Sequence, residues 1–95
     1  MPQEAKEQIM KLWGKLWKSN HLIKDAVVTV ETEDTRTHNI FQGLEELCLI
    51  FDLGKPMWLD SSIRDFQRHK RVRFYQDSFN EEISFDYMEF LVLEE

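Results

Sequence analysis

The order of sequence patterns predicts an α+β fold: a small antiparallel sheet of three to four strands with two helices packed on one face. Two observations indicate this class. Segments rich in Val, Ile and aromatic residues lie near both ends of the chain, at 10–32 and 84–94, and such composition suits strands. Helical periodicity with capping residues lies between them, at 35–52 and 61–70. Ninety-five residues correspond to one domain that can bury a core.

The first segment has two interpretations. Its apolar residues recur at helical spacing, and they are Ile9, Leu12, Trp13, Leu16 and Trp17. Gly14 argues against a helix, since glycine costs about 1 kcal/mol relative to alanine there. We favour a hairpin with strands over 10–18 and 21–32, because Ser19-Asn20 suits a turn and the Val-rich run that follows suits a strand. Residues 1–9 are then a loose leader to a domain over 10–95, and a helix over 3–18 is the alternative.

A longer helix is predicted over 35–52. Asp34, Thr35 and Thr37 offer capping oxygens at its start. Gly54 supplies a left-handed residue after its end, where Pro56 prevents continuation. Gly43 inside this helix is not explained by propensity and indicates close approach of another backbone, that of the sheet.

The second half predicts a shorter helix and two strands. Asp60-Ser61-Ser62 caps a helix over 61–70, and Ser62 and Asp65 have the spacing of a capping box. VRFYQ is a short strand, and DSFNEEI is a turn or a single helical turn. The strand over 84–94 is apolar on both faces, which is typical of a central strand or of one that meets a partner. Phe85, Tyr87, Leu91 and Leu93 are expected on one face, with Met88, Phe90 and Val92 on the other.

Charge is unevenly distributed. The net charge is −6, made of −3 over 1–63, +4 over 64–73 and −7 over 74–95. The simplest interpretation is that the acidic C-terminal segment pairs internally with the basic segment. The alternative is that the basic segment binds RNA or single-stranded nucleic acid, with nearby aromatic rings stacking on bases. Its phosphate-binding candidates are Arg64, Arg68, Lys70, Arg71 and Arg73.

The sequence predicts no enzyme, no cofactor and no metal site. His21, His38 and His69 are scattered and lack metal-ligand spacing. Cys48 lies on an apolar helix face, where a thiolate is disfavoured. A single cysteine excludes an internal disulfide and suits a reducing cytoplasm. No segment has the pattern of a signal peptide or membrane span, so no membrane partner is expected.

The tryptophans are the remaining candidates for function. Trp13 and Trp17 share one side in a strand or in a helix, and Trp58 is the third. The first two either cover the edge of the core or form an apolar patch, and tryptophan is enriched at interface hot spots. We expect a small non-enzymatic protein-interaction module, with a homodimer as one form, that uses the Trp13/Trp17 face or an exposed strand edge.

The stretch from Met10 to the end includes TRTH, the LG-KP-WL turn, IRDFQRH and EISFDYMEFLVLEE. In these features it resembles small hypothetical proteins of clostridia and related Gram-positive anaerobes. The resemblance implies a bacterial cytoplasmic domain whose usual start is near Met10. It carries over no activity, cofactor or site residue.

Overall fold

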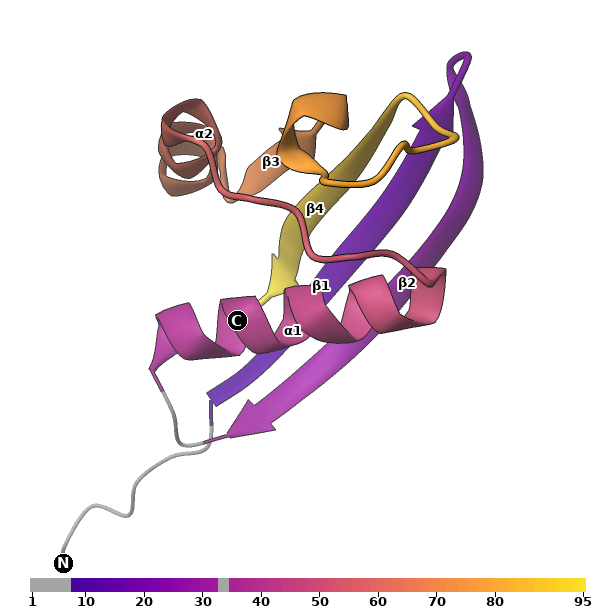
Figure 1. Ribbon diagram of the computed structural model, residues 1–95. Coiled ribbons are helices and arrows are strands. Elements are labelled where there is room, and N and C mark those ends of the chain that lie inside the picture. The colour runs from indigo at the N-terminus through magenta and orange to yellow at the C-terminus, as the bar shows by residue number, and fades with distance from the viewer. Residues whose placement is uncertain (1–7, 33–34) are drawn as a thin grey trace, which may run out of the picture.

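The computed structural model describes residues 8–32 and 35–95, which form an antiparallel sheet with two helices on one face, confirming the predicted fold class (Figure 1). The elements in chain order are β1 (Gln8–Lys18), β2 (His21–Thr32), α1 (Arg36–Phe51), α2 (Asp60–His69), β3 (Arg71–Phe74), the 3-10 turn η1 (Gln76–Ser78) and β4 (Tyr87–Glu94). The strand order is β2-β1-β4-β3, so the last strand lies in the middle of the sheet, as its two apolar faces predict. No helix in the described ranges has the length and apolar character needed to cross a membrane.

The predicted hairpin is correct. Ser19 and Asn20 both have positive φ, 51° and 65°, the turn geometry that matches the twist of paired strands. β1 pairs with β2 on one side and with β4 on the other. The alternative helix is therefore wrong from Gln8 onward, because β1 makes its hydrogen bonds with two neighbouring strands. β1 also takes the last two residues of the predicted leader, while residues 1–7 lie outside the described ranges.

The ends of α1 follow one prediction and contradict another. Thr35 is the N-cap, and its Oγ1 accepts a hydrogen bond from the His38 backbone N–H at 3.2 Å. Gly54 is not the left-handed residue at the other end, since Asp52 occupies that conformation with φ of 58°. Aspartate tolerates this region, so the helix ends at Phe51, three residues before the glycine. The Gly54 N–H instead donates to Glu81 Oε1 at 2.6 Å.

The predicted capping of α2 is wrong. Leu59 is the N-cap and makes no side-chain capping bond. Ser62 is buried within the helix, so the Ser62–Asp65 spacing is not a capping box. Asp60 lies in the first turn, where its negative charge suits the positive end of the helix. After α2, Lys70 adopts a left-handed conformation and turns the chain directly into β3.

β4 begins three residues later than predicted. The expected faces hold for Tyr87 and Leu91 on one side and for Met88 and Phe90 on the other. Phe85, however, precedes the strand and lies in the core, where its ring meets that of Phe79 edge to face at 5.9 Å between centroids. Strand alternation therefore does not apply to it.

The core lies between the helices and one face of the sheet. Alternate residues of each strand are buried there: Met10, Leu12 and Leu16 from β1, Val28 and Val30 from β2, Val72 and Phe74 from β3, and Met88 and Phe90 from β4. α1 covers β1 and β2, as Figure 1 shows. Phe66 of α2 stacks on Phe90 with ring centroids 5.7 Å apart.

Gly43 allows α1 to lie close to β1. A Cβ at this position would lie 2.0 Å from Leu12 Cδ1 and 3.4 Å from Val30 Cγ2. The predicted close approach of a sheet backbone is therefore wrong, because side chains of β1 and β2 fill the space beside Gly43. Any larger residue must displace Leu12, which is fully buried.

We expect the effect of Gly43→Ala on stability to change sign with residue 12. In the wild-type background, overpacking outweighs the gain of about 1 kcal/mol in helix propensity, so unfolding free energy falls by about 1 kcal/mol. In a Leu12→Ala background, itself less stable by about 3 kcal/mol, space exists for the methyl group and the same substitution raises stability by about 1 kcal/mol. Urea denaturation of the four proteins measures this, and the same sign in both backgrounds would contradict the packing described.

Candidate functional site

The face of the sheet opposite the helices carries both N-terminal tryptophans. Trp13 and Trp17 project from β1 on either side of Lys15, and their side chains are half-buried. Register places Val27 and Leu91 beside Trp13, and Leu22 and Tyr87 beside Trp17. We call this surface the open face, and it comprises Trp13, Lys15, Trp17, Leu22, Asp25, Val27, Arg71, Arg73, Tyr87, Glu89 and Leu91.

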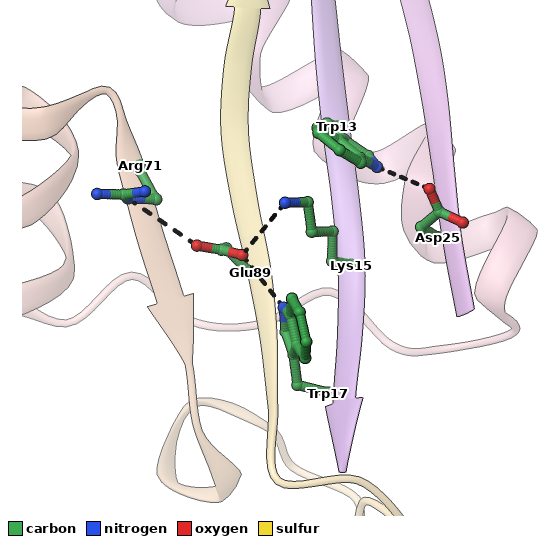
Figure 2. Close-up of polar contacts among 6 residues, drawn as sticks. All are labelled: Trp13, Lys15, Trp17, Asp25, Arg71 and Glu89. Atoms are coloured by element: carbon green, nitrogen blue, oxygen red, sulfur yellow. Dashed lines mark hydrogen bonds and ion pairs between the residues drawn. The ribbon is translucent and has the colours of Figure 1, made fainter. Parts of the chain in front are cut away.

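A buried carboxylate lies at the centre of the open face (Figure 2). Glu89 of β4 is only 6% exposed. Its Oε1 accepts a hydrogen bond from Trp17 Nε1 at 3.1 Å and lies 3.8 Å from Lys15 Nζ. Its Oε2 lies 3.9 Å from Arg71 Nε. Because a buried carboxylate is costly without partners, these contacts restrain three side chains, two from β1 and one from β3, around one point.

The tryptophan rings are held by charges as well as by packing. Lys15 Nζ lies 3.7 Å from the Trp13 ring centroid and 5.9 Å from that of Trp17, close enough for cation–π attraction. Trp13 Nε1 donates to Asp25 Oδ2 on β2 at 2.9 Å, as Figure 2 shows. Both indole N–H groups are therefore satisfied within the chain, and the ring surfaces form a pre-arranged platform.

A second aromatic group lies toward β3. The Arg73 guanidinium is 4.9 Å from the Tyr87 ring centroid, and the Tyr75 and Tyr87 rings are 5.4 Å apart. A hydrogen bond to Tyr75 raises the pKa of Arg73. Beside it lies a hollow of about 310 Å³ lined by Asp65, His69, Arg71, Val72, Arg73 and Tyr75. This edge of the open face therefore combines cations with an exposed ring.

The cations of the basic segment 64–73 differ in whether they form ion pairs. Lys70 pairs with Glu95 at 3.2 Å, and Arg71 pairs with Glu89. Within the described ranges, Arg64 and Arg68 on α2 form no ion pair. Pairing with the acidic C-terminal segment is thus confirmed for Lys70 and Arg71 and is wrong for Arg64 and Arg68.

Glu95 connects three elements. Arg36, the first residue of α1, donates to both carboxylate oxygens, from Nε at 2.6 Å and from Nη2 at 3.1 Å. Lys70, at the end of α2, supplies the second cation. Hydrogen bonds from Arg36 and Lys70 lower the pKa of Glu95 to about 2. The carboxylate also brings negative charge to the start of α1, whose first turn has no acidic residue.

Trp58 does not belong to the open face. It lies in the loop between the helices, on the covered side of the sheet, and its ring meets those of Phe66 and Phe74 edge to face at 5.5 and 5.0 Å. Trp13 and Trp17 thus share a surface, while Trp58 covers the core.

The surroundings of Cys48 and of the possible metal ligands bear on catalysis and metal binding. Cys48 is 2% exposed, and burial raises the pKa of its thiol to about 11, so a thiolate nucleophile is disfavoured. In the described part of the chain, no three His, Cys, Asp or Glu residues are grouped to hold a metal ion.

Sequence patterns did not single out Glu89, Lys15 or Asp25. Alternation along β1 and β4 places Lys15 and Glu89 each on a particular face. Only the pairing of β1 with β4 brings them together, and these two strands are some seventy residues apart in the chain.

No family model, curated protein or solved structure matches the chain. The resemblance to small clostridial proteins therefore stays a prediction.

We expect Trp17→Phe to destabilise the protein more than Trp13→Phe. Both changes remove an indole N–H, but that of Trp17 donates to the buried Glu89, whereas that of Trp13 donates to the exposed Asp25. Losing a donor to a buried acceptor costs about 1–3 kcal/mol, while the exposed carboxylate regains water and the change stays within about 1 kcal/mol. Urea denaturation of both variants measures the difference, and equal losses would contradict the role given to Glu89.

We also expect acid to weaken the ion pairs that Glu95 forms with Arg36 and Lys70. Because the pKa of Glu95 is depressed in the folded state, its stabilising contribution is complete above the ordinary value of 4.5 and is lost as pH falls toward about 2. Glu95→Gln should therefore lower stability at pH 6 and have little effect near pH 2. Arg36→Gln should likewise reduce the loss of stability on acidification. Urea midpoints across this range test the expectation, which fails if wild type and both variants respond identically to pH.

Proposed function

We propose that this protein is a small non-enzymatic interaction module that binds another protein surface through its open face. The observation that carries the proposal is the pair of tryptophan rings held on the helix-free side of the sheet by Lys15, Asp25 and Glu89. Tryptophan is enriched at interface hot spots, and side chains already ordered in the free protein lose less entropy on binding.

The surroundings of the rings support a protein partner. Val27 and Leu22 beside them are 50% and 44% exposed, which is a large apolar exposure for neighbouring positions. The charged members of the open face are three cations and two carboxylates, so the surface is nearly neutral. A mixed surface of this kind suits a protein partner better than a polyanion.

The second candidate function is binding of RNA or single-stranded nucleic acid through the basic segment. The hollow beside β3 favours it, since Arg71 and Arg73 adjoin the exposed ring of Tyr75, an arrangement that suits a phosphate next to a stacked base. Against it stand the net charge of −6, the pairing of Arg71 with Glu89, and Asp65 in the same hollow.

We further propose that the protein works in a bacterial cytoplasm. The single cysteine and the resemblance to clostridial proteins support this location.

A photo-crosslinking residue tests the binding function. Placed at Val27 on the open face and activated in cells that produce the protein, benzoylphenylalanine should form adducts with protein. The control position is Leu49, which is 75% exposed on α1 and lies outside the open face, and it should give few adducts. Digestion with protease or nuclease, followed by mass spectrometry, distinguishes a protein partner from a nucleic acid. A nuclease-sensitive adduct would favour the second candidate, and equal yields at both positions would overturn the proposed site.

A further inference from the structure

We propose that the partner of the open face is a second copy of this chain, packed face to face about a two-fold axis that runs parallel to the strands. This inference rests on the proposed function and specifies its partner. Three properties of the face support a second copy: the distribution of charge across it, the aromatic and apolar side chains of its inner strands, and its area.

Opposite charges occupy opposite edges of the open face. β2 is one edge strand, and its Asp25 and Glu31 project on this side. β3 is the other edge strand, and its Arg71 and Arg73 project on the same side. Three strand spacings separate the edges, so the two signs lie about 15 Å apart. The face thus has an acidic side and a basic side.

This polarity selects one symmetric arrangement. A two-fold axis along the strands places β2 of one copy over β3 of the other, so that Asp25 faces Arg73 at two equivalent positions. A two-fold axis across the strands places β2 over β2 and β3 over β3, which opposes like charges. Since like charges across an interface are costly, only the first arrangement is self-complementary, as a two-fold interface requires.

The centre of the face is compatible with the same arrangement. β1 and β4 are the inner strands, and the axis passes between them. Trp13 and Trp17 of each copy then lie over Leu91 and Tyr87 of the other. This buries aromatic rings on both sides of the central Lys15–Glu89 pair and leaves Asp25 and Arg73 at the rim. Aromatic residues are enriched at the core of protein interfaces, and sheets pack in this way with strands roughly aligned.

The area of the face predicts a weak dimer. Four strands spaced about 4.8 Å apart, with a length set by the eight residues of β4, give a face of about 500 Å² per copy. About 1,000 Å² in total is below the usual range for stable complexes. The dimer should therefore form in a concentration-dependent way and dissociate on dilution.

Charge reversal with mixing tests the arrangement. Sedimentation of the wild type from about 10 µM to about 1 mM should show the mass rising from 11.5 kDa toward twice that value. Asp25→Arg alone and Arg73→Asp alone each create two like-charge contacts per dimer, so each should raise the dissociation constant at least about tenfold. An equimolar mixture of the two variants has two opposite-charge contacts per mixed dimer, and it should recover dimerisation to near the wild-type level.

The matched control is Arg64→Asp, which makes the same change of charge on α2 and should leave dimerisation unaltered. Circular dichroism verifies that all variants are folded. Folded single variants whose mixture does not dimerise would overturn the arrangement, as would a wild type that stays at 11.5 kDa up to about 1 mM. In either case, crosslinking from position 27 to a different protein would still support the proposed function. If position 27 gave no protein adduct, the proposed function would be overturned as well.

Discussion

The two-residue alternation of β1 is the constraint on which the rest of the structure depends. β1 pairs with β2 through a two-residue turn and with β4 on its other side. Even-numbered residues such as Leu12 and Leu16 enter the core, and odd-numbered residues such as Trp13, Lys15 and Trp17 form the open face. A slip of one residue would exchange the two sets and expose the core. The same register therefore determines both the packing of the helices and the composition of the surface available for binding.

On the covered side, the helical layer approaches the sheet as closely as its side chains permit. Gly43 provides room for Leu12 beneath α1, and the Phe66–Phe90 stack positions α2 over the inner strand β4. Glu95 then joins the beginning of α1 to the end of α2 through Arg36 and Lys70. These contacts lie on the helical side, whereas the buried Glu89 and its partners Lys15, Trp17 and Arg71 join the strands on the open face.

Many charged side chains of this protein form ion pairs with neighbours, so no large surface of one sign results. Glu89 lies between Lys15 and Arg71 inside the open face and offsets one of their two charges, and Glu95 pairs with Lys70 at the margin of the helices. What remains on the open face is an acidic edge along β2 and a basic edge along β3. An arrangement of this kind favours a partner with the opposite polarity over a uniform polyanion, which is why a protein surface suits it better than a nucleic acid.

Local patterns in the sequence determined the element types, the fold class, the hairpin turn and the face shared by Trp13 and Trp17, because period and turn chemistry are properties of adjacent residues. They misplaced two caps: Asp52 rather than Gly54 takes the left-handed conformation after α1, and Leu59 precedes α2 without a side-chain capping bond. The separation of Trp58 from Trp13 and Trp17, the burial of Glu89 and the Arg36–Glu95 pair depended on tertiary structure alone. Each of these features involves elements that are distant in the chain. Their relative positions follow from the strand order β2-β1-β4-β3, which neighbouring residues do not specify.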